Sequence, residues 1–231
     1  IEYEEEKIHI IMEYCNGGTL LQLMNSPYPL SDYEIYKISY QLFSALKYLH
    51  SRGIAHRDIK PENIMFDSNM GIRLIDFEFS FEAFSDSLCK TICGTLLYKA
   101  PEMFQSEKYD PFAADIWSAG LTILSAFNKG TPFKQANIKN IAKEIQQWDC
   151  QITGSMNSQM REFLDKVIVQ KPKERITANE AVSILEKMNI SLYHKDENMR
   201  RKKSEYIPIT VNRNLILTKP RNHLRKTMFI R

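Results

Sequence analysis

The sequence HRDIKPEN places a carboxylate, an ammonium group and an amide within six positions, at Asp58, Lys60 and Asn63. Catalytic loops use such groups to hold and move charge, although each of them could also be an ordinary polar residue of a loop. A further carboxylate, Asp76, ends the apolar sequence IRLID. Asp76 has two interpretations, a solvated side chain or a metal ligand, and the second leaves the nearby Glu78 unexplained.

Two regular elements are expected to position this loop. Before it, Ser31 and Glu34 form a capping box, and a helix is predicted that ends near Gly53, where a left-handed terminator belongs. The apolar residues at helical spacing are Ile35, Ile38, Leu42, Ala45, Leu46 and Leu49. After the loop, the short runs IMFD and IRLID, separated by the turn-rich SNMG, predict a small β-hairpin. The loop therefore lies between two rigid elements, where catalytic groups are commonly held.

Elsewhere the hydrophobic pattern predicts one buried helix surrounded by others. Residues 113–127 are apolar nearly all round, which indicates a helix in the centre of a domain. Further helices are expected at 136–148, at 158–169 and from Thr177, where Glu180 completes a second capping box. Near the start of the chain, KIHIIMEY is expected to form a buried strand, and CNGGTL a turn that leads into a short helix.

The sequence RLIDFEFSFEAF, residues 73–84, alternates between polar and apolar residues. By periodicity alone it is a half-buried β-strand that carries Asp76 and Glu78 on its polar face. Residues 79–112 hold few periodic signals, and a long irregular stretch of that kind is usually functional or disordered.

Composition indicates an ordinary globular protein, because 43% of the 231 residues are apolar and 26% are charged. The four cysteines fit neither a zinc spacing nor a disulfide framework. Reduced thiols and a cytoplasmic location, with the nucleus as the alternative, are therefore expected. No apolar run is long enough to span a bilayer, so no membrane partner is expected. The chain begins at Ile1 rather than at a methionine and is expected to belong to a longer product.

The charge of the chain is unevenly distributed. Residues 193–231 contain 11 Lys or Arg and 3 Asp or Glu, whereas residues 1–192 contain 20 and 25. We expect a domain over residues 1–190 and a basic, flexible tail over residues 191–231. A solvated tail is favoured over nuclear import or docking on an acidic surface, and nucleic acid is not the expected partner.

Two further motifs, GTLLYKAPE and DIWSAG, follow HRDIKPEN in order. Several short motifs in a fixed order are more specific than any one of them. Together they resemble the C-terminal lobe of eukaryotic protein kinases, over roughly residues 8–188. The resemblance implies an α+β fold that is mainly α-helical with small β-hairpins and lacks most of the N-terminal β-lobe. It implies a protein serine/threonine kinase that transfers the γ-phosphate of ATP to proteins, with a weak likeness to calcium/calmodulin-dependent kinases.

By this resemblance, Asp58 would accept or orient the proton of the substrate hydroxyl, and Lys60 would neutralise charge on the transferred phosphate. Asn63 and Asp76 would hold Mg²⁺ between the phosphates of ATP. The residue types suit these roles, because phosphoryl transfer needs positioned cations and Mg²⁺ prefers carboxylate and amide oxygens.

The sequence IIMEYC resembles the kinase hinge. Met12 would be the gatekeeper residue, and the backbones of Glu13 and Cys15 would pair with adenine. Leu20 and Met65 would sandwich the adenine ring by apolar contact. For each of these side chains, plain core packing is the alternative interpretation.

Lys60, two positions after Asp58, and Thr95, in the sequence CGT, are similar to residues of serine/threonine kinases rather than tyrosine kinases. Ser or Thr acceptors are therefore expected in the protein substrates. Glu62 stands where related kinases that prefer an arginine before the acceptor carry a carboxylate, and a plain surface glutamate is its alternative. Arg57 would capture a phosphate that an upstream activating kinase adds to Thr91. That pairing would order residues 79–100, called the activation segment below.

Other residues are expected to support the site. Glu102 and Arg175 resemble the ion pair that ties the end of the activation segment to the lobe. His56 and Phe77 are expected to pack, and Asp115 is expected to hold the backbone of the catalytic loop.

The chain departs from the kinase pattern in two places. A glycine-rich phosphate loop, its strand lysine and the partner glutamate are missing before the hinge, so this chain alone is expected to bind ATP poorly and to expose an apolar face. Glu78 stands where the family has glycine. A pseudokinase that binds partners is therefore the alternative function, and a binder of nucleic acid or acidic surfaces through the basic tail is a third. Tolerance of Glu78 is favoured, because Asp58, Lys60, Asn63 and Asp76 all remain.

Overall fold

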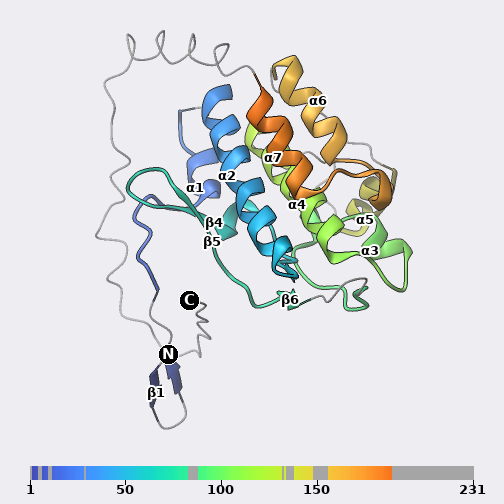
Figure 1. The fold of residues 1–231 in the computed structure, drawn as a ribbon, viewed down its shortest axis with the longest axis horizontal. Helices are drawn as coiled ribbons and strands as arrows, with labels where there is room; N and C mark the ends of the chain where they lie inside the picture. Colours follow the sequence, from blue (N-terminus) through green and yellow to red (C-terminus); the bar gives the residue numbers. More distant parts are fainter. Residues whose placement is uncertain are drawn as a thin grey trace.

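Helices α2 (Asp32–Ser51), α4 (Pro111–Asn128) and α7 (Ala178–Lys187) form the frame of the structure, with α2 packed against both of the others (Figure 1). The structure is a computed structural model. It describes residues 2–4, 7–9, 12–28, 30–82, 88–131, 133, 138–147 and 156–188. The predicted tail, residues 191–231, lies outside these ranges.

The start and end of α2 follow from local signals in its sequence. The Ser31 hydroxyl accepts the backbone N–H of Glu34 at 3.2 Å, and the Glu34 carboxylate accepts the backbone N–H of Ser31 at 2.7 Å. Gly53, two residues after the end of α2, has a φ of 72°, which is the left-handed conformation that glycine adopts without strain. The predicted capping box and terminator are both confirmed.

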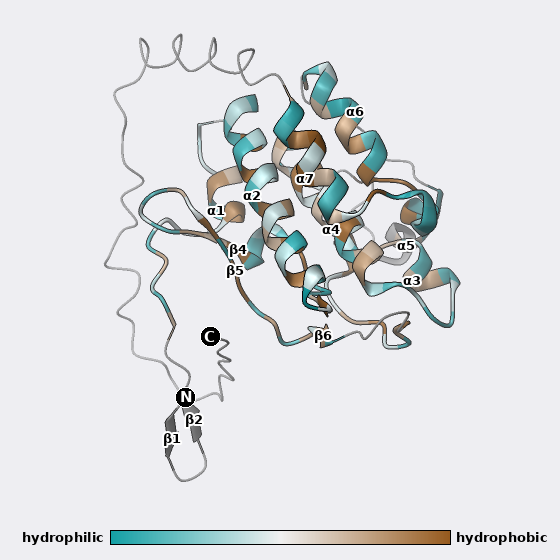
Figure 2. Cartoon of the chain, viewed as in Figure 1, coloured by the Kyte–Doolittle hydropathy of each residue, from teal (hydrophilic) through white to brown (hydrophobic). Residues whose placement is uncertain are grey.

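Helix α4 is buried along almost its whole length, as its apolar sequence predicts. It begins at Pro111, two residues before the predicted start, because Asp110 caps it and proline suits the first helical position. The Asp110 carboxylate accepts the backbone N–H groups of Phe112 and Ala113 at 2.9 and 3.3 Å. Hydropathy colouring shows the apolar residues of α4 behind the more polar outer helices (Figure 2).

The remaining helices surround this frame. They are α1 (Leu20–Met24), α3 (Glu102–Gln105), α5 (Ile138–Gln147) and α6 (Ser158–Val167), with short 3-10 turns at Pro61–Asn63, Leu96–Tyr98 and Pro172–Glu174. The helices expected at 136–148 and 158–169 are α5 and α6. Helix α6 ends two residues before the predicted end, and residues 136, 137 and 148 lie outside the described ranges. Thr177 caps α7 with Glu180 at its third position, so the second capping box is confirmed as well.

Strands in the described chain form three antiparallel pairs. The pairs are β1 (Glu2–Glu4) with β2 (Lys7–His9), β3 (Ile54–Ala55) with β6 (Phe81–Glu82), and β4 (Ile64–Phe66) with β5 (Ile72–Leu74). The last pair is the predicted hairpin, with Met65 opposite Arg73. A mainly helical α+β fold with small β-hairpins is thereby confirmed. Of KIHIIMEY only Lys7–His9 is a strand; residues 12–14 are not, and residues 10 and 11 lie outside the described ranges.

The continuous strand predicted over residues 73–84 is wrong. Strand β5 ends at Leu74, and Asp76 has a φ of 65°, a left-handed conformation that no strand contains. A turn follows, in which the Ser80 N–H bonds to the Phe77 carbonyl at 3.0 Å, before the short β6. The alternating sequence therefore contains the end of one strand, a turn and the beginning of another strand.

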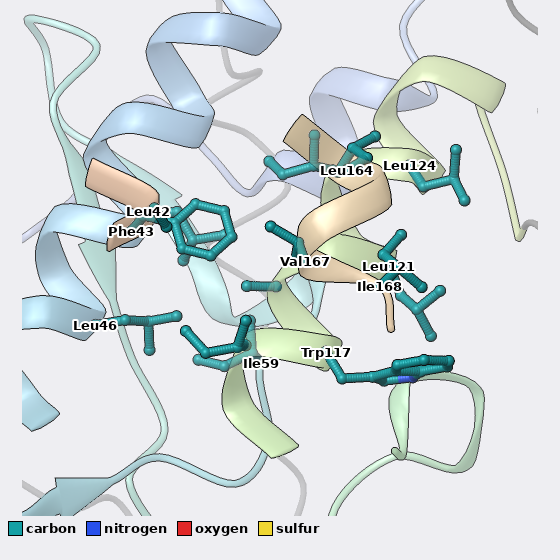
Figure 3. Close-up of a cluster of buried hydrophobic side chains, with 14 of the residues drawn as sticks. Leu42, Phe43, Leu46, Ile59, Trp117, Leu121, Leu124, Leu164, Val167 and Ile168 are labelled. Atoms are coloured by element: carbon teal, nitrogen blue, oxygen red, sulfur yellow. The ribbon is translucent and has the colours of Figure 1, made fainter. Parts of the chain in front are cut away.

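The core lies where α2, α4 and α6 meet. The close-up in Figure 3 shows Leu42, Phe43 and Leu46 of α2 facing Ile59 and the side chains of α4 and α6. Phe43 and Phe163 meet edge to face, with ring centroids 5.2 Å apart. Ile59 has no exposed surface, so the core anchors the catalytic loop (residues 56–63) between Asp58 and Lys60. None of the helices in the described ranges is long and apolar enough to cross a bilayer.

Candidate active site

Asp115, on the first turns of α4, holds the backbone of the catalytic loop. It is 1% exposed, and its Oδ2 accepts the backbone N–H of His56 at 2.8 Å while its Oδ1 accepts that of Arg57 at 2.7 Å. The imidazole Nε2 of His50 on α2 lies 3.0 Å from the same Oδ2. The predicted role of Asp115 is confirmed: one carboxylate ties the loop to the buried helix.

His56 and Phe77 belong to the scaffold, as predicted. The His56 ring lies 3.0 Å from the Ile75 carbonyl through its Nε2 and packs on the Phe77 ring, with centroids 4.7 Å apart. Burial lowers the pKa of His56 despite the opposing effect of the Asp115 carboxylate. The ring is therefore neutral near pH 7, where it supports the segment that carries Asp76.

Four donors surround the Asp58 carboxylate. Its Oδ1 accepts the backbone N–H and the hydroxyl of Thr95, at 2.8 and 2.9 Å. Its Oδ2 accepts Lys60 Nζ at 2.7 Å and Asn63 Nδ2 at 3.1 Å. The structure thus brings together the three side chains predicted from HRDIKPEN, and both oxygens of the carboxylate are fully hydrogen-bonded.

The environment of Asp58 sets its protonation state. Burial raises the pKa of this carboxyl, but the hydrogen bonds from Lys60 and Thr95 outweigh burial and hold the pKa below its ordinary value. Asp58 is 4% exposed and is nevertheless ionised at neutral pH. It is a well-positioned but weak base.

The sequence does not reveal that Thr95 contacts Asp58. In the sequence Thr95 indicates only the class of acceptor, yet in the structure its hydroxyl lies between Asp58 and Lys60 and accepts a hydrogen bond from Lys60 Nζ at 2.8 Å. Thr95 is 37 residues from Asp58, so no local spacing could have indicated the contact. Gly94 makes the approach possible, since its φ is 80° and a Cβ there would collide with the Arg57 carbonyl oxygen.

The predicted magnesium ligands, Asn63 and Asp76, lie on connected pieces of backbone. The Asn63 carbonyl accepts the N–H of Ile75 at 3.0 Å, and Asp76 follows with its side chain exposed. Asn63 Nδ2 donates to Asp58 on two oxygens, which leaves the amide oxygen to face a cation. Carboxylate and amide oxygens fit Mg²⁺. The described residues contain no cluster of three or more His, Cys, Asp or Glu side chains that could hold a metal.

The predicted hinge residues differ in how much surface they offer. Met12 is 53% exposed, whereas Cys15 is buried, and burial raises the pKa of its thiol. Leu20 has no exposed surface in this structure, which agrees with its alternative interpretation of core packing. Met65, half-buried and bridged to Thr19, keeps a surface for a ring. Adenine binding by these residues stays a prediction.

The predicted regulatory pair is not in contact in this structure. The Arg57 guanidinium donates to the Phe79 carbonyl at 2.7 Å and lies 3.3 Å from the Cys89 sulfur. Thr91 is exposed, and its carbonyl accepts the Tyr109 hydroxyl at 3.0 Å. Arg57 therefore lies beside the activation segment, and capture of a phosphate on Thr91 stays a prediction.

The predicted ion pair between Glu102 and Arg175 is confirmed. Arg175 Nη1 and Nη2 bond to the two carboxylate oxygens at 2.8 and 3.1 Å, and both side chains are buried. The guanidinium also donates to the carbonyls of Ala113 and Val169 and lies over the Trp117 ring, 5.1 Å from its centroid. One arginine thus joins the end of the activation segment to α4 and to the chain after α6.

The chain is similar in sequence to known proteins. The family model described as "Protein kinase domain" matches residues 1–184. The chain is 33% identical over 186 residues to CBL-interacting serine/threonine-protein kinase 16 of Arabidopsis thaliana, covering 76% of this chain and 40% of that protein. It is also 33% identical over 198 residues to an Aurora kinase of Debaryomyces hansenii, covering 85% of this chain and 48% of that protein.

The chain therefore spans less than half the length of the curated relatives it matches. Another of them, CBL-interacting serine/threonine-protein kinase 10 of Arabidopsis thaliana, is 34% identical over 202 residues, or 86% of this chain. The matched family, the identities and the motifs gathered around Asp58 agree with one another. The chain belongs to the protein kinase family, among relatives of the serine/threonine type.

Proposed function

We propose that this chain is the catalytic part of a protein serine/threonine kinase, which transfers the γ-phosphate of ATP to Ser or Thr hydroxyls of protein substrates. The observation that supports it most is the position of Lys60, whose ammonium lies between Asp58 Oδ2 at 2.7 Å and Thr95 Oγ1 at 2.8 Å. A cation and a carboxylate held this way suit a reaction in which a hydroxyl attacks a charged phosphate.

Asp58 orients the acceptor hydroxyl more than it removes the proton in advance. Its lowered pKa makes it a poor base before phosphate transfer begins. All four of its hydrogen-bonding positions are occupied by Thr95, Lys60 and Asn63, so an incoming hydroxyl must displace one donor. Asp58 then takes the proton as the hydroxyl oxygen bonds to the γ-phosphorus and the bond from that phosphorus to the ADP leaving group breaks.

Lys60 couples the binding of the transferred phosphate to the acceptance of the proton by Asp58. Its ammonium is the strongest of the contacts that lower the pKa of Asp58. A transferred phosphate competes for the same ammonium, because charge-assisted bonds to phosphate are strong. As Lys60 turns toward the phosphate, the pKa of Asp58 rises, and the carboxylate becomes a better base at the moment it is needed.

Protein kinases use ATP and Mg²⁺, and the residues present fit both. Asn63 and Asp76 would hold Mg²⁺, which supplies positive charge against the phosphates when it is bound. The backbones of Glu13 and Cys15 would pair with adenine, and Met65 would contact the ring. These assignments are part of the proposal.

Radiolabelled phosphate transfer from ATP to a Ser/Thr peptide library tests the proposed function, with the longer product as the enzyme because this chain alone is expected to bind ATP poorly. Asp58→Asn should reduce transfer at least a hundredfold while MgATP binding stays within about threefold, because the change removes the proton acceptor but keeps the side-chain shape. Lys171→Met is the matched control, since Lys171 lies in an exposed ion pair with Glu174. Equal transfer by the Asp58→Asn variant and the wild type would contradict the proposal.

A pseudokinase that binds partners is the second candidate, because Glu78 stands where the family has glycine. The local structure favours tolerance of Glu78 instead, since its side chain is exposed in the turn after Phe77 and its φ is negative, so this turn needs no glycine. Glu78→Gly should therefore change phosphate transfer by less than about threefold. ATP binding by the wild type without any transfer, together with a large gain in Glu78→Gly, would favour a restrained or inactive kinase.

We further propose a cytoplasmic location, with nuclear import through the basic sequence MRRKKS as the alternative. The cytoplasmic location rests on the cysteine spacing, which fits neither a zinc site nor a disulfide framework. The nuclear alternative rests on the basic charge of residues 193–231. Fluorescent fusions with and without residues 191–231 distinguish the two, because only import through the tail depends on those residues.

A further inference from the structure

Arg73, on β5, forms an ion-pair network that the proposed reaction does not use. Its Nε donates to Glu13 Oε2 and its Nη2 to Glu13 Oε1, both at 3.2 Å. The same Nη2 lies 3.0 Å from Asp67 Oδ2. A guanidinium is a planar fork that matches a carboxylate on two bonds, so Arg73 fixes the direction as well as the distance of Glu13.

Asp67 is a rigid anchor for this network. Its Oδ1 accepts the backbone N–H groups of Asn69 and Gly71, both at 2.8 Å. These two bonds, more than Arg73, lower the pKa of the Asp67 carboxyl, so it carries its charge throughout the neutral range. The turn is closed tightly on it, because a Cβ at Gly71 would lie 2.6 Å from Asp67 Oδ2.

The turn and strand that carry Arg73 are attached to the long helix α2. Gln41 on α2 accepts the backbone N–H of Ile72 at 3.0 Å and donates to the Met70 carbonyl at 3.3 Å. The side chain of one helix residue therefore fixes the backbone on both sides of Gly71. The position of Arg73 is therefore fixed relative to α2.

The segment that follows Glu13 is fixed at its other end by β4. The Gly17 N–H bonds to the Phe66 carbonyl at 2.8 Å, and the Phe66 N–H bonds to the Gly18 carbonyl at 2.9 Å. The backbones approach so closely that a Cβ at Gly17 would lie 2.7 Å from Phe66 Cβ. Between the two fixed ends, Cys15 is buried.

We propose that Arg73 is a positioning residue, which holds the backbone of residues 13–15 in the shape that adenine requires. It acts through the Glu13 side chain and has no contact with the nucleotide itself. The inference deepens the proposed function and takes its ligand, ATP, from it. Because Arg73 and Glu13 are both partly exposed, the effect on ATP affinity is about two- to fivefold rather than larger.

Hydrogen–deuterium exchange of the full chain without nucleotide tests the structural part. Arg73→Gln should increase the exchange of a peptide covering residues 12–18, since one of the two attachments of that segment is lost. Lys171→Gln, which breaks the exposed pair with Glu174 far from the hinge, should leave that peptide unchanged. Unchanged exchange at residues 12–18 in Arg73→Gln would overturn the inference, whether or not ATP binds.

Kinetics with ATP and a peptide substrate test the functional part. Arg73→Gln should raise KM for ATP about two- to fivefold, with kcat and KM for the peptide within about twofold of wild type. Glu13→Gln should raise KM for ATP by a similar factor, and the double variant Glu13→Gln with Arg73→Gln should cost no more than either single change, because both remove the same ion pair. A uniform fall in kcat, or additive effects of the two single changes, would overturn the positioning role. These kinetics use the longer product that the sequence leads us to expect, because this chain alone is expected to bind ATP poorly. If the longer product binds no MgATP at millimolar concentration, the proposed function is contradicted, and the exchange result still decides the role of Arg73.

Discussion

The Asp115 carboxylate accepts the backbone N–H of Arg57 at 2.7 Å, so a buried side chain of α4 holds the residue that directly precedes Asp58. Arg57 has a φ of 65°, a conformation that costs a non-glycine residue of order 1 kcal/mol or more. The bond to Asp115, with its companion to His56, offsets that cost. The shape of the catalytic loop is therefore enforced from the core.

We expect Asp115→Ala to lower the free energy of unfolding by about 2–4 kcal/mol, because two buried backbone N–H groups lose their acceptor. Phosphate transfer should fall more than tenfold even where the variant is folded, since Arg57 would leave its left-handed conformation. Urea denaturation followed by fluorescence measures the first quantity. Asp110→Ala, which removes only the exposed cap of the same helix, should cost about 1 kcal/mol. A similar cost for both variants would contradict the special role of Asp115.

Breaking the buried pair of Glu102 and Arg175 should be among the most destabilising single changes. Arg175→Met leaves the Glu102 charge buried without its partner, and we expect a loss of about 3–5 kcal/mol. The double variant Glu102→Gln with Arg175→Met should be more stable than Arg175→Met alone, because no charge is stranded. Thermal and chemical denaturation check both, with Lys171→Met, in an exposed pair, expected within about 0.5 kcal/mol of wild type. If Arg175→Met were as stable as the double variant or more stable, the stranded charge of Glu102 would not be the cause of the loss.

Phosphorylation of Thr91 should redirect Arg57. In the present structure Arg57 bonds to the Phe79 carbonyl and the Cys89 thiol, which are weaker partners than a phosphate. Activation by an upstream kinase should therefore disappear in Thr91→Ala and persist in Thr91→Ser, which keeps an acceptor hydroxyl. Rates of peptide phosphorylation before and after treatment measure the effect. Undiminished activation of Thr91→Ala would rule out this site.

His56 should make stability depend on pH. Burial lowers the pKa of His56 in the folded chain, so below about pH 6.5 the unfolded chain binds a proton that the folded chain does not. The free energy of unfolding should therefore fall as pH is lowered from about 6.5, by at most about 1.4 kcal/mol per pH unit from this group, until the folded pKa is reached. His56→Phe should flatten this dependence in urea titrations between pH 5 and 7. Parallel curves for the two proteins would assign the dependence to other groups.

Local signals in the sequence predicted the helices well. The capping boxes at Ser31 and Thr177 each involve residues three positions apart, so a short stretch of sequence contains the whole interaction. The start of α4 was displaced by two residues because hydrophobic periodicity took precedence over the Asp110 cap and the proline that follows it. Helix ends depend on caps more than on apolar pattern.

The strand predicted over residues 73–84 failed for a different reason. Alternation reports which faces are polar, but it does not report the left-handed φ of Asp76 or the turn at Phe77–Ser80. The motif HRDIKPEN gave Asp58, Lys60 and Asn63, yet the Thr95 contact depends on a long-range approach of two loops. The same holds for Arg73 and Glu13, which are 60 residues apart in sequence.

Gly120 in the middle of α4 has a mechanical consequence for the whole lobe. A Cβ at this position would lie 2.6 Å from Val167 Cγ1 and 2.7 Å from Ile168 Cγ1, where α6 ends. The next residue, Val169, has a carbonyl that accepts hydrogen bonds from Arg175, which also donates to Glu102. A methyl group added at Gly120 would push α6 away from α4. Displacement of Val169 would then weaken the position of Arg175 and Glu102, which hold the end of the activation segment.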